Sequence, residues 1–93
     1  MEQTARIRRM EQSLRRASRA VRNLSEALDI YEKALPDFAA LNDYYGSDDW
    51  KQDFLDDESG RLPQGLKRGV LSEDSIWNLL EALSELRERA KRL

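Results

Sequence analysis

Residues 7–35 read IRRMEQSLRRASRAVRNLSEALDIYEKAL, and this stretch decides the fold class. Its apolar residues recur at alternating intervals of three and four, which is the heptad pattern of a helix with one apolar face. We call this face the heptad stripe, and its members are Ile7, Met10, Leu14, Ala17, Val21, Leu24, Leu28, Tyr31 and Leu35. No Gly or Pro interrupts residues 2–35, so the pattern predicts one long helix.

Pro36 follows the heptad stripe directly and removes one helical hydrogen bond. The apolar spacing nevertheless continues in phase through Phe38 and Tyr45, with Asn42 between them. We therefore expect the long helix to be kinked near Pro36 and to continue to about Tyr45. Gly46 is a suitable residue to end it.

A second amphipathic helix is expected from about Ser72 to the end of the chain. Ser72 is a good N-cap, and two acidic residues follow it in the first turn. Its apolar residues again alternate by three and four, at Ile76, Leu79, Leu83, Leu86, Ala90 and Leu93. Two such helices should pack through their apolar faces, so the sequence predicts an all-α fold built on an antiparallel two-helix hairpin.

The segment between the two helices lacks a long apolar period. Ser47 should cap a short helix over residues 48–57, and Gly60 should end it. Pro63 disfavours a helix at the residue before it, so an extended lid is expected there. The prediction is a single helical domain over 1–93, made of a long kinked helix (1–45), a short helix plus lid (46–71) and a C-terminal helix (72–93).

Aromatic residues are absent from the first thirty and the last sixteen positions. Antiparallel packing of the two long helices would bring them to one end of the molecule. We expect a structural aromatic head, under the lid, formed by Tyr31, Phe38, Tyr45, Trp50, Phe54 and Trp77. We call residues 46–71, the short helix plus lid, the insert. Covering the aromatic head is the main role that we expect for it.

The composition restricts the chemistry that the chain can perform. Its 93 residues include no Cys and no His, which removes disulfides, thiol catalysis and the commonest general base and metal ligand. We predict no catalytic residues, no cofactor, no metal site and no enzyme activity. The low-ranked alternative is a metal-dependent hydrolase using carboxylates of the acidic insert, although their spacing does not match a calcium loop. With no signal-type or membrane-spanning apolar run, we expect a cytoplasmic protein without a membrane partner.

The net charge of −2 is unevenly distributed along the chain. Residues 36–75 carry ten acidic and four basic groups, whereas residues 1–35 carry eight basic and five acidic groups. Four arginines fall in one narrow sector opposite the heptad stripe, and we call them the arginine stripe: Arg8, Arg15, Arg19 and Arg22. They could bind nucleic-acid phosphates, dock an acidic protein or form a solvated helix face.

The insert also offers a second candidate surface. Asp49, Asp53, Lys67 and Arg68 are polar residues that aromatic packing would hold in place, which is typical of a binding surface on a loop. A lower-ranked hypothesis is that they form one recognition patch, with Asp53 paired to Lys67 or Arg68. The favoured interpretation is that the insert is a lid alone.

The insert resembles a known family. The segments YYGSDDWKQDF and DDESGRLPQGLKRGVLSED, leading into IWNLLEAL, are similar to a family of small bacterial proteins known as domain of unknown function 4298. The positions that carry the resemblance are Tyr44, Tyr45, Asp49, Trp50, Asp53, Gly60, Leu62, Pro63, Gly69, Val70, Leu71, Ser72 and Asp74. The resemblance implies a small all-helical protein with no assigned activity.

These observations favour a non-catalytic protein–protein interaction module with an unknown protein partner. The alternative is a nucleic-acid accessory protein that binds phosphates through the arginine stripe. The first helix is longer than the last, which would leave Ile7, Met10 and Leu14 bare. The sequence therefore also predicts a homodimer, with coiled-coil character in the first helix.

Overall fold

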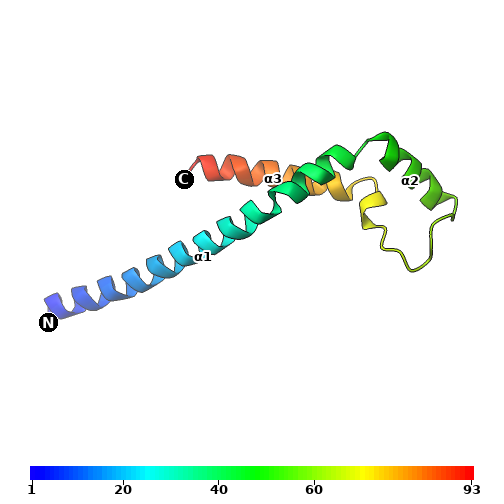
Figure 1. The fold of residues 1–93 in the computed structure, drawn as a ribbon. Coiled ribbons are helices and arrows are strands. Elements are labelled where there is room, and N and C mark those ends of the chain that lie inside the picture. The colour runs from blue at the N-terminus through cyan, green and yellow to red at the C-terminus, as the bar shows by residue number, and fades with distance from the viewer. The chain divides into compact units, whose positions relative to one another are not determined.

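A computed structural model describes all residues 1–93 and contains only helical elements (Figure 1). In chain order these are α1 (Glu2–Tyr44), α2 (Asp48–Glu58), the 3-10 helix η1 (Gly69–Leu71) and α3 (Ser75–Lys91). No strand is present, so the predicted all-α class is confirmed. The chain divides into two compact units, Met1–Leu35 and Pro36–Leu93. The antiparallel arrangement of the two long helices stays a prediction.

The first unit is a single helix, the N-terminal part of α1. Because it contains no second element, its apolar face has nothing within the unit to pack against. Leu14 and Val21 of the heptad stripe are 61% and 67% exposed. No residue of α1 is buried, so the helix does not bury the stripe that its sequence pattern presents.

Helix α1 is continuous through Pro36 and ends at Tyr44, one residue before the expected position. Pro36 lacks an amide N–H, so the carbonyl of Glu32 loses its helical donor at this point. Gly46 follows the helix end with a φ of +79°, a left-handed conformation that glycine adopts without steric cost. The kink near Pro36 stays a prediction.

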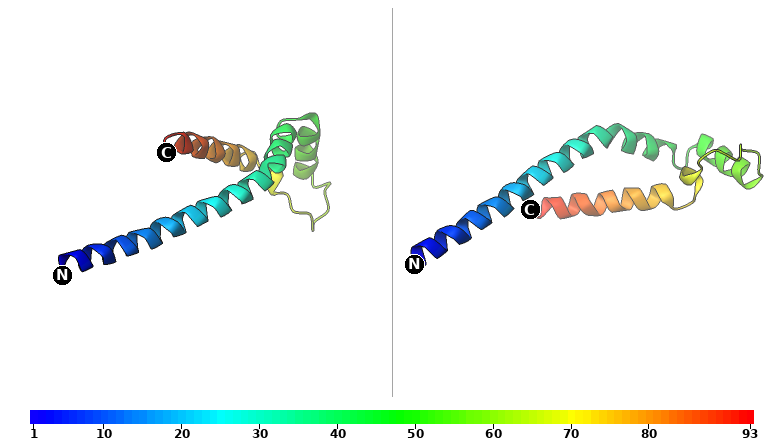
Figure 2. Two further views of the ribbon diagram at one scale, coloured as in Figure 1. Left: turned by 60° about the vertical axis from the view of Figure 1, so that its left-hand side comes forward. Right: turned by 90° about the horizontal axis from the view of Figure 1, so that it is seen from below.

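Both ends of α2 carry the expected local signals. Ser47 Oγ accepts a hydrogen bond from the Trp50 amide at 3.1 Å and donates one to the Tyr44 carbonyl at 2.6 Å. At the other end Gly60 has a φ of +72°. The amides of Gly60 and Arg61 donate to carbonyls in the last turn of α2, a Schellman motif that satisfies the helix end. In both views of Figure 2 a loop outside any helix follows and leads to η1.

The start of α3 differs from the prediction. The helix begins at Ser75, three residues after Ser72, which instead ends η1 in an extended conformation. The hydroxyl groups of two serines hold the backbone in a turn before the helix. Hydroxyls of both Ser72 and Ser75 donate to the Gly69 carbonyl, and Ser72 Oγ also accepts from the Ser75 amide at 3.3 Å. Ser72 therefore stabilises a turn that precedes the helix.

The core of the second unit lies where η1 meets α3. Leu71 and Ile76 are 6% and 3% exposed, and they are the buried apolar residues of the chain. Leu41 of α1 is half-buried and lines a groove together with Ile76. A core of this size supports only modest stability, as expected for a short chain.

Candidate functional site

Three aromatic rings of the second unit form a contiguous cluster. Tyr45 meets Trp50 edge to face, with ring centroids 5.2 Å apart, and Trp50 stacks on Phe54 at 5.3 Å. Trp50 and Phe54 lie one turn apart on α2, so the helix itself places both rings on one face. The aromatic head is thus built on α2 and the residue that follows α1.

Two polar atoms of this cluster reach distant parts of the unit. The Trp50 indole N–H donates to the Val70 carbonyl at 3.0 Å, and the Tyr45 hydroxyl donates to the Glu73 carbonyl at 2.9 Å. Both acceptors are backbone atoms in or just after η1. The cluster therefore fixes the segment that leads into α3.

The other expected members of the head are Tyr31, Phe38 and Trp77. Tyr31 belongs to the first unit, and Phe38 is half-buried on the part of α1 in the second unit. Trp77 is 54% exposed, so the expectation that it packs in the head is wrong. Its position on α3 places it instead beside a shallow pocket of about 250 Å³ that Leu80 also lines.

A row of acidic residues runs along α2 at intervals of four. Asp53, in the middle of the row, accepts a hydrogen bond from the Tyr44 hydroxyl at 2.5 Å. Asp57 pairs with the Arg68 guanidinium at 2.8 Å. Burial of the Tyr44 phenol, followed by the hydrogen bond and charge of Asp53 and the charge of Asp49, raises the pKa of Tyr44 to about 12. Tyr44 is therefore a neutral hydrogen-bond donor at ordinary pH.

The predicted pairing within the recognition patch is wrong. Asp53 binds the Tyr44 hydroxyl, and Arg68 binds Asp57 instead of Asp53. Lys67 lines a separate apolar groove of about 350 Å³, together with Leu41 and other residues. Neither Tyr44 nor Asp57 was predicted to belong to the recognition patch, although Asp57 follows Asp53 by four residues on a predicted helix.

The acidic side chains of the insert take part in local contacts. Asp56 accepts a hydrogen bond from Gln52 at 3.0 Å and lies 3.6 Å from the Arg61 guanidinium. The structure contains no group of three or more acidic side chains arranged to hold a metal ion. Three of the acids of α2, Asp53, Asp56 and Asp57, are thus partners of neighbouring side chains.

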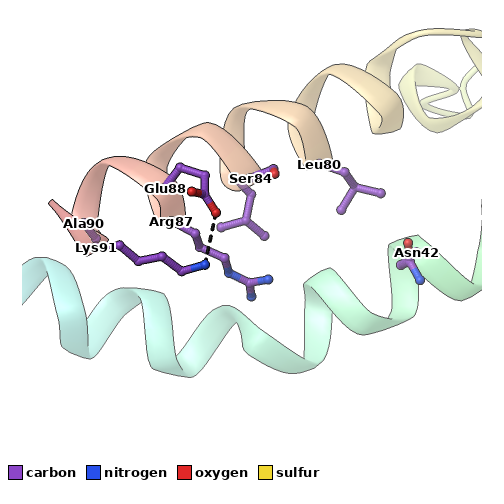
Figure 3. Close-up of a pocket in the computed structure, with 8 residues that line it drawn as sticks. Asn42, Leu80, Ser84, Arg87, Glu88, Ala90 and Lys91 are labelled. Carbon is purple, nitrogen blue, oxygen red and sulfur yellow. Dashed lines mark hydrogen bonds and ion pairs between the residues drawn. The ribbon is translucent and has the colours of Figure 1, made fainter.

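An open groove of about 510 Å³ lies between Asn42 and the outer half of α3 (Figure 3). Leu80 and Leu83 give it an apolar part, and Arg87 lines it further along α3. Glu88 and Lys91 pair at 3.0 Å at its far end. Asn42 occupies the position where the heptad spacing of α1 places a core residue, so polar and apolar groups share this groove.

The arginine stripe is exposed throughout. Arg8, Arg15, Arg19 and Arg22 all lie on the first unit with solvent-exposed side chains. Their helical positions place them opposite the heptad stripe. The first unit therefore presents an apolar face and a cationic face on opposite sides of one helix.

These features define a small all-α protein with two units and no helix that is long and apolar enough to cross a membrane. The chain matches the model of DUF4298, a domain of unknown function, over residues 7–93 and belongs to that family. This confirms the resemblance of the insert. No curated protein and no solved structure matches the chain.

Proposed function

We propose that the chain is a non-catalytic protein–protein interaction module that docks through the heptad stripe of the first unit. One observation carries the proposal: the members of the heptad stripe from Ile7 to Leu28, about three heptads, are solvent-exposed on a helix with no other element in its unit. Exposed apolar surfaces of this extent mark contact sites.

The energetics of a lone helix support docking. An amphipathic helix in a protein gains most of its stability from packing its apolar face, because helix propensity alone is marginal in water. Burial of apolar surface contributes roughly 25 cal/mol per Å². Leu24 and Leu28 each expose half or more of their surface, so a partner helix would remove a large apolar area from water.

The hydrogen bond and ion pair made by the acidic residues of α2 support a role without catalysis. Tyr44 is protonated at neutral pH, and Asp53 and Asp57 are in contact with Tyr44 and Arg68. A general base needs a free acceptor whose pKa lies near the working pH. Asp53, Asp56 and Asp57 act instead as acceptors for neighbouring side chains, which disfavours the metal-dependent hydrolase considered from the sequence.

A second candidate function rests on the arginine stripe. Its four guanidinium groups are exposed, and arginine binds phosphate in a bidentate manner. The stripe lies opposite the apolar face, so nucleic acid could bind while the apolar face is docked. The overall pI of about 5.2 opposes this function.

A photo-crosslinking amino acid placed on each face tests the proposed function. Leu24 lies in the heptad stripe, whereas Ile30 is a matched control that is apolar and 69% exposed but lies outside the stripe. With the full chain expressed in its own host, we expect protein adducts from position 24 and few from position 30. Equal adduct formation at the two positions, or none at either, would contradict docking through the stripe.

A further inference from the structure

We infer that the partner of the heptad stripe is a second copy of this chain, held in a parallel, in-register, two-stranded coiled coil over residues 6–35. The inference rests on the proposed function and adds the identity and direction of the partner. It is carried by three features of the first unit: the length of the stripe, the residues at its core positions and the charges that flank it.

The stripe is long enough and suitably composed for a coiled coil. Its core residues at the first heptad position, a, are Ile7, Leu14, Val21, Leu28 and Leu35. Those at the fourth position, d, are Met10, Ala17, Leu24 and Tyr31. Four heptads reach the length at which this pattern is typical of coiled coils. β-Branched residues at position a, here Ile7 and Val21, favour two strands when Leu occupies position d, as Leu24 does.

The charges beside the stripe favour a parallel pair. Positions e and g flank the core and form the contacts that set partner choice and orientation. Arg6 occupies g, and Glu11 occupies e of the following heptad. In a parallel, in-register pair these two positions on opposite chains lie side by side, so Arg6 of each copy meets Glu11 of the other. Symmetry provides this attraction twice.

An antiparallel pair offers no such attraction. In that orientation e residues lie beside e residues, and g residues lie beside g residues. The charged e residues of the stripe are Glu11 and Glu32, both acidic, and Arg6 is the charged g residue. The remaining flanking residues are uncharged, namely Ser13, Ser18, Ala20, Ser25, Ala27 and Ala34. No pair of opposite charges can form there, so the parallel orientation is preferred.

The arginine stripe fits the same assembly. Arg8, Arg15 and Arg22 occupy position b, and Arg19 occupies position f, both on the outside of a two-stranded coiled coil. The cationic groups of the two copies therefore stay away from the interface. This arrangement avoids the repulsion that these arginines would cause at flanking positions.

Two measurements on the full chain test the inference. Sedimentation equilibrium should give twice the chain mass of 10.9 kDa. Because the chain has no Cys, an introduced cysteine is its only thiol, so a disulfide-linked dimer shows that this position meets its counterpart in the second copy. Under mild oxidation Leu14→Cys should form a disulfide-linked dimer, since identical a residues meet only in a parallel, in-register pair. Gln12→Cys, at the outer position f, is the control and should cross-link far more slowly.

A charge exchange adds a readout that does not depend on cysteine. Arg6→Glu should raise the dimer Kd several-fold at low salt, because it places two acids together, and Arg6→Glu with Glu11→Arg should restore it. Tryptophan fluorescence, which comes from Trp50 and Trp77 of the second unit, verifies that each variant keeps that unit folded. A monomer at all concentrations, or equal cross-linking at positions 14 and 12, would overturn the inference. Adducts at position 24 to a different protein alone would overturn it and leave the proposed function intact.

Discussion

The indole N–H of Trp50 donates a hydrogen bond to the backbone carbonyl of Val70, twenty residues further along the chain, at 3.0 Å. This bond ties α2 to η1 and closes the loop between them. Stacking of Trp50 on Phe54 and its edge contact with Tyr45 hold the indole in place. The insert is thus fastened to the head by a defined contact, which supports its role as a structural lid.

Trp50→Phe should separate the hydrogen bond from the ring packing. The variant keeps an aromatic ring but removes the indole donor, so we expect a loss of about 1 kcal/mol in the free energy of unfolding. Trp50→Ala should cost more, although less than the roughly 3–5 kcal/mol of a fully buried ring, because Trp50 is only half-buried. Chemical unfolding followed by circular dichroism measures both. Equal losses in the two variants would show that the ring contacts contribute nothing beyond the hydrogen bond.

The contact between Tyr44 and Asp53 should make the free energy of unfolding depend on pH in the alkaline range. Its pKa is raised from 10.0 to about 12, so the folded state favours the protonated phenol. The resulting stability is fully present below about pH 10 and is lost as the pH rises towards 12. The free-energy difference between the wild type and Tyr44→Phe should therefore shrink over this range. Unfolding of both proteins at several alkaline pH values measures it.

The titration of the phenol itself provides the control. The chain contains three tyrosines, and ultraviolet absorbance should show one of them ionising late in the wild type. That late step should be absent in Tyr44→Phe and should move to lower pH in Asp53→Asn, which lacks the neighbouring charge. If all three tyrosines ionise together in the wild type, the Tyr44–Asp53 contact does not persist in solution.

The ion pair between Arg68 and Asp57 should contribute little stability. A double-mutant cycle with Arg68→Ala and Asp57→Ala should give a coupling of about 0.2–1 kcal/mol, because the Arg68 side chain is partly exposed. The matched control is Arg61 with Asp56, a longer and more exposed pair, for which we expect a smaller coupling. Variants of Arg68 and Asp53 test the recognition patch in a different way, through binding of protein partners. If Arg68→Ala and Asp53→Asn both keep their partners in a pull-down, the predicted patch is excluded. If either variant loses a partner without losing stability, the patch is supported.

Arg15→Glu combined with Arg19→Glu tests the nucleic-acid alternative. Both side chains are exposed, so the variant should change the free energy of unfolding by no more than about 0.5 kcal/mol. Fluorescence anisotropy with single- and double-stranded DNA should show no salt-dependent binding by the wild type. Salt-dependent binding that the double variant loses would instead support the phosphate-binding function.

Local signals in the sequence predicted the elements well. Ser47 and Gly60 mark the two ends of α2, because caps depend on residues only a few positions apart. Ser72 was predicted to cap α3, but it stabilises a turn that precedes the helix. The hydroxyls of Ser72 and Ser75 both donate to the Gly69 carbonyl, and α3 begins at Ser75. The N-cap position of α3 is Asp74, whose side chain makes no capping hydrogen bond, so the types of residue did not locate this helix start.

Long-range contacts were harder to predict from sequence. Asp53 was expected to pair with a cation of the loop, but it accepts a hydrogen bond from the Tyr44 hydroxyl at the end of α1 instead. Trp77 was assigned to the head because it is aromatic and near the start of α3, but its side chain is largely exposed. Both errors concern the direction in which a side chain points, which depends on packing between elements and not on spacing within one.

Hydrogen exchange of the full chain across a dilution series tests the central claim most directly. Protection of amides in residues 7–35 should rise with protein concentration, because pairing of the heptad stripe with a second copy stabilises a helix that is marginal alone. Residues 36–93 should show constant protection, and Leu24→Glu should abolish the rise. If residues 7–35 exchange at the same rates throughout the series and in Leu24→Glu, the heptad stripe is not a docking surface for a second copy.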